Sequence, residues 1–537
     1  MAKADEAACE MGLLIIAAYY RAYPDAVSLQ NDTTNAFNSV SGKYLLHYAS
    51  RLRGRQYLSK YFGTDRKVIY KSDASPGVKY EVKNASISQG DRTGGKCFEA
   101  VQGAVLRAVM AVACLPPMRR FHPLLVAVSD NIVILARSLD VILAMCRLMR
   151  SGDNEVDFER WGVMADDFTR VKADYGGVFP SLERRGLIAD KGLKSSLVVV
   201  QSRGEPLPTQ QQRERLRELS LILGYFHEED SADGNVYNFL GVPALGSKAA
   251  KAAAVEKMAN SMIGKFDEVA HAVHTEANSG IEATIKNPRA TLHWVMRYTL
   301  PAALMHVARN CDPEFTRCVF EAFDGKVQER FVENTRLADT AWLGAYRARY
   351  GELAVPPSLS AQLNLSLRQA GFAVTSLSKT CDSAFIGAAA KSMNSSKHLL
   401  EASSPGDNDE GWHAILHKGP YKGALGRVVR VREELKDDDK AMEYMNTYLT
   451  LAEDNVHGTA GDAKAQSTLT KYLHKKRYGE LKGHLPKLPN GVTDGETEEL
   501  GDVLYHHRFR DGNDAVPDDQ KFLIEKTTRS PGSRLRA

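Results

Sequence analysis

Two aspartates of this chain adjoin apolar runs of the kind that form buried β-strands. Asp32 comes just after Val-Ser-Leu-Gln at residues 27–30, and Asp130 lies between the apolar runs 124–128 and 132–135. Carboxylates that neighbouring strands bring together are hard oxygen ligands, which Mg²⁺ prefers. Two such cations about 3.5–4 Å apart can stabilise the attacking and the leaving oxygen of a displacement at phosphorus. The pair is therefore a candidate two-metal site, and the alternative is two unrelated surface aspartates.

Polar turns supply further candidates close to these aspartates. Phe37 lies in the Asn-Ala-Phe-Asn turn at residues 35–38, and Asn131 directly follows the second aspartate. A third polar turn, Ser-Ile-Ser-Gln-Gly-Asp at residues 86–91, precedes an apolar helical pattern. Its glycine would let the backbone approach a ligand closely. These turns suggest that the site is assembled from several short segments.

The elements that must position these residues follow from hydrophobic periodicity and from turn residues. Helices are expected at residues 5–22, 41–53, 97–114, 137–150 and 158–175, and strands at 27–30, 124–128, 132–135 and 197–200. A hairpin is expected from 68–70 to 78–82 across a Ser75-Pro76-Gly77 turn, and a strand over 237–243 that ends in a Gly/Pro turn. From Ser247 to about residue 349 the pattern is almost purely helical. The order predicts an α+β fold over the first 240 residues, followed by a mainly helical region.

The bulk composition is that of a globular protein with several domains. A chain of 537 residues exceeds one compact core, and its 43% apolar and 25% charged residues are ordinary. The net charge of +4 is small, so contacts with nucleic acid would have to come from local patches. No apolar run is long enough for a membrane span. Scattered cysteines without a C-x-x-C pair favour buried free thiols in an intracellular protein.

The order of the motifs resembles the palm of reverse transcriptases. Asp-x-x-Asn-Ala-Phe at residues 32–37, then Gln-Gly-Asp at 89–91, then the hairpin-tip Asp130 occur in the family's order. The non-LTR, LINE-like retroelement branch is the nearest resemblance. It implies an α+β fold, with a split βαβ antiparallel palm followed by a mainly helical thumb and C-terminal region. It also implies template-directed DNA synthesis by two-metal nucleotidyl transfer.

Roles for individual residues follow from this resemblance. Asp32, Asp130 and Asn131 take the catalytic positions, and Asp32, Asp130 and the carbonyl of Thr33 take the positions that bind Mg²⁺ or Mn²⁺. Phe37 matches an aromatic residue that stacks under the sugar and excludes a 2′-hydroxyl, although a core phenylalanine explains it nearly as well.

Further positions correspond to contacts with the nucleotide and the primer. Gln89 and Gly90 match a pair that touches the incoming nucleotide, and Lys194 fits a lysine near the triphosphate, with a solvated lysine as the alternative. Phe239, Leu240 and Gly241 resemble the primer-grip hairpin. Residues 365–374 resemble a segment that follows the thumb in LINE-like elements.

The resemblance also implies domains, partners and a location. The expected domains are a palm with a remnant of fingers at 1–235, a primer-grip hairpin with helical thumb and connection at 236–400, and a linker with a charged C-terminal region at 401–537. The expected partners are an RNA template, a DNA primer and deoxynucleoside triphosphates, with no membrane. The expected location is nuclear.

Departures from the family pattern leave the activity open. The hairpin tip of active members carries two adjacent acids, whereas Asn131 follows Asp130 here, and few residues precede Asp32 where fingers are expected. Asn131 brings no charge to a metal site. Three hypotheses follow: an impaired reverse transcriptase, an inactive nucleic-acid-binding remnant, or an unrelated helical interaction protein.

A basic stretch near the C-terminus is the best patch for nucleic acid. Residues 471–477, Lys-Tyr-Leu-His-Lys-Lys-Arg, combine cations with an aromatic ring, and Tyr478 follows them. Such residues can bind phosphates and stack on bases. A solvated helix face is an equal alternative.

Overall fold

The computed structural model describes residues 8–23, 26–31, 33, 36–49, 55–63, 66–72, 75–82, 94–152, 165–187, 196–199, 226–228, 236–278, 285, 288–334, 347–348, 351, 357–364, 372–403, 420–449 and 464–484. These residues form a mainly helical protein with small sheets, which confirms the general α+β class expected from the sequence. The chain separates into two compact units, one of Met1–Leu240 with Leu399–Ile415 and one of Gly241–His398 with Leu416–Ala537. Among the described residues, no helix is both long and apolar enough to cross a membrane.

The first unit is built on a five-stranded sheet in the order β4-β5-β1-β6-β7. The strands are β1 (Val27–Asn31), β4 (Leu124–Val128), β5 (Asn131–Ala136), β6 (Ser196–Val199) and β7 (Phe226–Glu228). β1 is antiparallel to β5 and to β6, and β4 is antiparallel to β5, whereas β6 and β7 run parallel. Helices separate β1 from β4 and β5 from β6, so these four strands follow a βαββαβ order.

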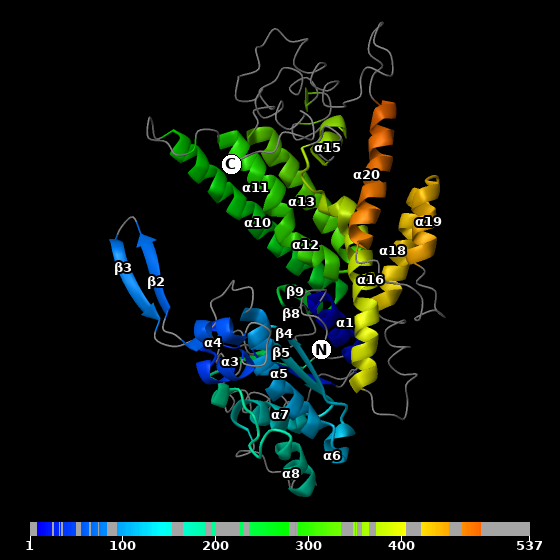
Figure 1. The fold of residues 1–537 in the computed structure, drawn as a ribbon. Coiled ribbons are helices and arrows are strands. Elements are labelled where there is room, and N and C mark those ends of the chain that lie inside the picture. Colours follow the sequence, from blue (N-terminus) through cyan, green and yellow to red (C-terminus); the bar gives the residue numbers. More distant parts are fainter. Residues whose placement is uncertain are drawn as a thin grey trace. The chain divides into compact units, whose positions relative to one another are not determined.

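Helices cover the sheet of the first unit (Figure 1). The helices of this unit are α1 (Ala8–Ala22), α2 (Ala36–Ser39), α3 (Gly42–Ala49), α4 (Arg55–Gly63), α5 (Gly94–Ala113), α6 (Pro116–Arg119), α7 (Leu139–Ser151) and α8 (Ala165–Ala173). The main contacts with the sheet come from α1, α5 and α7. Side chains of β5 alternate between the two faces of the sheet. Ile132 and Ile134 belong to the core formed with α5 and α7, whereas Val133 and Leu135 point to the opposite face, and all four are fully buried. β5, the neighbour of β1, is therefore packed on both of its faces. Each fully buried aliphatic side chain stabilises the fold by about 1.5–3 kcal/mol.

Most of the expected elements are confirmed, and two turns were predicted wrongly. The β2 (Arg66–Ser72) and β3 (Ser75–Val82) strands pair Ser72 with Ser75, so Pro76 and Gly77 lie inside β3 and not in the turn. The expected strand at 237–243 is a hairpin, with β8 (Tyr237–Phe239) joined to β9 (Val242–Leu245). Gly241 does lie in its turn, but Pro243 lies within β9, which a two-stranded sheet tolerates because a strand edge needs no donor there.

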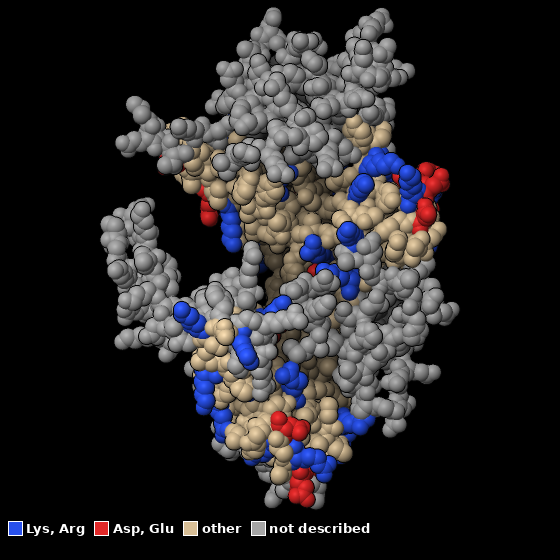
Figure 2. All heavy atoms as spheres, in the orientation of Figure 1, with Lys and Arg blue, Asp and Glu red and all other residues tan. Residues whose placement is uncertain are grey.

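Lys and Arg side chains are spread over the surface of the first unit, with few Asp and Glu among them, on the face shown in Figure 2. A positively charged surface attracts phosphate groups, and this attraction weakens as the salt concentration rises.

The second unit is helical beyond β9. Its helices are α10 (Lys248–Ala277), α11 (Pro288–Tyr298), α12 (Leu300–Asn310), α13 (Pro313–Asn334), α15 (Pro357–Asn364), α16 (Leu377–Ser403, of which residues 399–403 belong to the first unit), α18 (Pro420–Leu435), α19 (Asp439–Tyr448) and α20 (Ala465–His484). Ser247 caps α10, because its hydroxyl accepts a hydrogen bond from the Ala250 amide at 3.1 Å.

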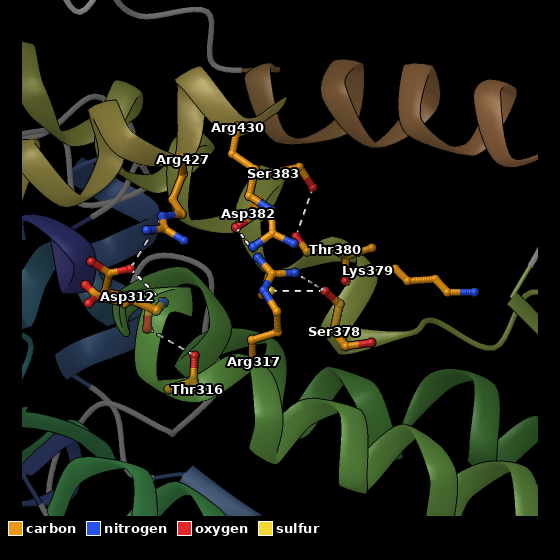
Figure 3. Close-up of polar contacts among 12 residues, drawn as sticks. Asp312, Thr316, Arg317, Ser378, Lys379, Thr380, Asp382, Ser383, Arg427 and Arg430 are labelled. Carbon is orange, nitrogen blue, oxygen red and sulfur yellow. Dashed lines mark hydrogen bonds and ion pairs between the residues drawn. The ribbon is translucent and has the colours of Figure 1, made fainter. Parts of the chain in front are cut away.

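An ion-pair network joins three of these helices (Figure 3). Asp382 on α16 is buried, and its carboxylate lies 2.6 Å from Nη2 of Arg317 on α13 and 3.6 Å from Nε of Arg430 on α18. Charges buried in this way need their partners, because an unpaired one is strongly destabilising. The network therefore fixes how α13, α16 and α18 pack together.

Candidate active site

The turn that carries Asp130 lies at the end of the sheet where β1 finishes. Ser129 and Asp130 join β4 to β5, and Ser129 adopts a left-handed φ of 55°. On the other side of β5, Asn31 at the end of β1 lies opposite Ile132. Neighbouring strands are about 4.8 Å apart, so the end of β1 and the Ser129–Asp130 turn share one edge of the sheet.

Asp32 itself lies outside the described residues, but the residues on each side of it are described. Asn31 is fully buried and Thr33 is 4% exposed. Asp130 and Asn131 are half-buried, so a solvent-borne ion can reach them. Among the described residues, no group of three or more His, Cys, Asp or Glu side chains is placed to hold a metal ion. Asp32 is not one of the described residues, so this result does not cover it. The oxygen donors available, a carboxylate and an amide at the turn, are of the type that suits Mg²⁺.

The start of β6 lies at the same edge of the sheet. Ser196 pairs with Gln30, so β6 begins where β1 ends. Lys194 precedes this strand by two residues and lies outside the described residues, as do Gln89 and Gly90. Their contacts therefore stay predictions.

Phe37 lies on α2, immediately after the Asp32 segment. Its ring packs against Phe98 of α5, with 4.8 Å between the ring centroids. The half-buried Phe37 belongs to the edge of the hydrophobic core. Core packing alone explains an aromatic residue here, and a role in sugar selection is compatible with it.

The Phe239-Leu240-Gly241 segment forms a tight hairpin turn. Leu240 and Gly241 have φ values of 53° and 75°, the left-handed pair that a two-residue hairpin favours. Phe239 is fully buried. A Cβ atom placed on Gly12 of α1 would come within 3.4 Å of the Phe239 ring and 3.2 Å of Val128. Phe239 is thus anchored beside the end of β4 that leads into the Asp130 turn.

Sequence reasoning missed a support for the segment that follows Asp32. The amide of Ser41 donates a hydrogen bond to the Arg185 carbonyl at 2.9 Å. The Arg185 side chain donates to the Val101 carbonyl of α5 at 2.9 Å and stacks over the Tyr44 ring. Gly186, with a φ of 80°, packs against the backbone of Ser39 and Ser41. The glycine after Arg-Arg was the available signal, because left-handed glycines commonly end helical turns.

Gly186→Ala should destabilise the first unit by about 3 kcal/mol. A Cβ atom there would overlap the Ser39 carbonyl oxygen and lie 3.1 Å from the Ser41 amide. A left-handed alanine costs about 1–2 kcal/mol, and the overlap adds a similar amount. Urea unfolding followed by circular dichroism would measure the loss.

Gly177→Ala is the matched control for this substitution. Gly177 has a φ of 79°, and no described atom comes within 4 Å of the position of its Cβ. It should cost about 1 kcal/mol, from the backbone alone. Equal losses in the two variants would show that the contact with Ser39 is unimportant.

No protein-family model matches the chain, and no curated protein matches it.

Proposed function

We propose that the first unit is the palm of a reverse transcriptase of non-LTR retroelement lineage, and that its DNA synthesis is slow. The observation that carries the proposal is the sheet register. It places the Asp130 turn beside the end of β1 that leads into Asp32. In this proposal the helices of the second unit correspond to a thumb and connection. The partners are an RNA template, a DNA primer and deoxynucleoside triphosphates.

The proposed site would hold its metal through the residues at this edge. Asp32, the Thr33 carbonyl and Asp130 would bind Mg²⁺ or Mn²⁺, and Asn131 would add a neutral amide oxygen. When bound, the ions supply activation of the primer 3′-hydroxyl and stabilisation of the leaving oxygen. Lys194, Gln89 and Gly90 would contact the nucleotide, and the anchored Phe239 hairpin would position the primer end. The basic surface of the first unit supports binding of a nucleic-acid backbone (Figure 2).

The neutral Asn131 is the reason for the low rate in this proposal. A site with one fewer carboxylate attracts divalent cations more weakly. The same observation favours a second candidate function, a nucleic-acid-binding remnant that no longer catalyses synthesis.

Asn131→Asp should raise the rate of primer extension about tenfold, or about 1.4 kcal/mol in the barrier. The added carboxylate strengthens the metal site that the proposal places at this turn. The measurement is incorporation of deoxynucleotides on an RNA template with a DNA primer, in Mg²⁺ and in Mn²⁺. Asn446→Asp makes the same change at an exposed position of α19 and should leave the rate unchanged.

The outcomes of this assay separate the two candidate functions. Extension in the parent chain that rises with Asn131→Asp supports the polymerase. Oligonucleotide binding without extension in either chain supports the remnant. Absence of both binding and extension would contradict both candidates.

A further inference from the structure

The basic stretch of α20 is used largely inside the second unit. Lys475 forms an ion pair with Asp438 at 2.7 Å. Lys476 donates a hydrogen bond to the Glu434 carbonyl. Arg477 donates from Nη2 to the Lys379 carbonyl at 3.2 Å and to the Glu434 carboxylate at 3.3 Å. These contacts pair three of the four Lys and Arg side chains of the stretch with α16, α18 and the start of α19, whereas Lys471 and Lys475 stay exposed.

Three basic residues of this interface lie close together. They are Lys379 in the first turn of α16, and His474 and Arg477 on α20. Burial lowers the pKa of Lys379, and the neighbouring Arg477 lowers it further. Burial also lowers the pKa of His474, with smaller contributions from Arg477 and Lys379. Each group therefore lies within electrostatic range of the other two.

The acids near this cluster are already occupied. Glu434 accepts from Nη2 of Arg477. Asp324, which partly offsets the shift of Lys379, accepts two backbone and two hydroxyl hydrogen bonds, from Ser376, Leu377 and Ser378. By contrast, Nη1 of Arg477 is buried and has no hydrogen-bond partner among the described residues.

The Lys379 side chain adds a second donor directed away from the structural ion pairs. It extends away from the Arg317–Asp382 pair and alongside α20 (Figure 3). Within the part of the chain that the structure describes, its amine makes no ion pair. Its carbonyl accepts a hydrogen bond from Nη2 of Arg477, which orients the guanidinium and leaves Nη1 without a hydrogen-bond partner among the described residues.

We propose that Lys379, His474 and Arg477 form a binding site for a phosphate group, between the start of α16 and α20. The Lys379 ammonium is partly removed from water and makes no ion pair within the described residues, which is costly, and a bound anion offsets that cost. A phosphate group fits because its several acceptor oxygens can take the fixed guanidinium and the flexible ammonium together. The site is independent of the proposed polymerase, since it contains none of the residues at the sheet edge.

Inorganic phosphate is the probe that tests this site in the full-length chain. The parent should melt at a higher temperature as phosphate replaces chloride at constant ionic strength, and it should broaden the ³¹P resonance of phosphate. Lys379→Gln should lower the phosphate affinity at least tenfold. Without phosphate the same variant should melt about 2 °C higher than the parent, because a repulsive buried charge is gone. A merely structural lysine would not produce this combination.

Lys471→Gln is the matched control, because Lys471 is exposed on the same helix and loses the same charge. It should behave like the parent. His474→Gln is a second variant within the site and should also weaken phosphate binding. A parent that responds equally to phosphate and chloride would overturn the proposal. So would a Lys379→Gln variant whose phosphate affinity equals that of Lys471→Gln.

A labelled RNA oligonucleotide distinguishes the source of the phosphate. If Lys379→Gln weakens oligonucleotide binding, and inorganic phosphate competes with the strand in the parent, the site takes a backbone phosphate. If oligonucleotide binding is unchanged while phosphate affinity falls, the site takes a free phosphate or a small phosphorylated molecule. Both results retain the site, and neither depends on primer extension.

Discussion

Asp130→Ala should lower primer extension at least a hundredfold. The comparison is best made in the Asn131→Asp background, where the starting rate is expected to be higher. Loss of a charged metal ligand removes several kcal/mol of transition-state stabilisation, and each 1.36 kcal/mol is a factor of ten in rate. Asp130 lies half-buried in a two-residue turn, so its replacement should change the free energy of unfolding by only about 0.5 kcal/mol. A large loss of activity with an unchanged melting temperature would identify a chemical role.

Two further variants sharpen this result. Asp130→Asn keeps the shape and removes the charge, so it should lose nearly as much activity as Asp130→Ala. Asp174→Ala removes an exposed turn aspartate of the same unit and should keep full activity. Extension by Asp130→Ala within threefold of its background would contradict the palm assignment. An experimental structure with Mn²⁺ that separates the Asp32 and Asp130 carboxylates by more than about 8 Å would contradict it too, because the two could not share metals.

The strands around the candidate site could be predicted because their signals are local. Val-Ser-Leu-Gln before Asp32 and the two apolar runs around Asp130 show β-type patterns, and the structure forms β1, β4 and β5 there. The edge shared by Asn31 and the Asp130 turn could be expected only through the resemblance. Strand pairing joins residues about a hundred positions apart, and a single sequence does not encode such a register locally.

Residues typical of turns gave a wrong prediction where strand pairing determined the position of the turn. Pro76 and Gly77 are typical of a turn, yet they lie inside β3 because Ser72 pairs with Ser75. Gly186 follows two arginines, and that pattern by itself indicates no more than the end of a helical turn. Its close approach to Ser39 joins segments far apart in the chain, so only the folded structure reveals it.

The basic stretch of α20 shows the same limit for charge. Lys475, Lys476 and Arg477 look like an open patch for nucleic acid when only the sequence is considered. Their partners Asp438, Glu434 and the Lys379 carbonyl come from other helices, so these three side chains are paired within the second unit, although Lys475 stays exposed. A cation that makes no ion pair within the described residues is Lys379, a residue that the sequence pattern did not single out.

Asp324→Ala should destabilise the second unit by about 3–5 kcal/mol. The Asp324 carboxylate on α13 is buried and accepts hydrogen bonds from the Leu377 and Ser378 amides, both at 3.0 Å. It also accepts from the hydroxyls of Ser376 at 2.7 Å and Ser378 at 2.6 Å. It thereby satisfies the first turn of α16, whose amides have no partner within the helix. Each buried donor left without an acceptor costs about 1–3 kcal/mol.

Urea unfolding followed by circular dichroism would measure this loss. The control is Asp437→Ala, at an exposed turn position between α18 and α19, and it should change stability by no more than about 0.5 kcal/mol. Asp324→Asn keeps one acceptor oxygen and should fall between the parent and Asp324→Ala. A loss below about 1 kcal/mol in Asp324→Ala would show that water replaces the carboxylate, contrary to its burial.

The pH dependence of the same substitution tests the state of the carboxyl group. Burial raises the pKa of Asp324, although the hydrogen bonds from Ser378, Ser376 and Leu377 act in the opposite direction. A carboxyl whose pKa is higher folded than unfolded binds its proton more tightly in the folded state. Its contribution is therefore fully present below the ordinary aspartate pKa and decreases as the pH rises through the raised value. The difference in unfolding free energy between the parent and Asp324→Ala should accordingly shrink as the pH rises from about 4. A difference that grows with pH would mean that the four hydrogen bonds outweigh burial, and that the ionised carboxylate is the form that caps α16.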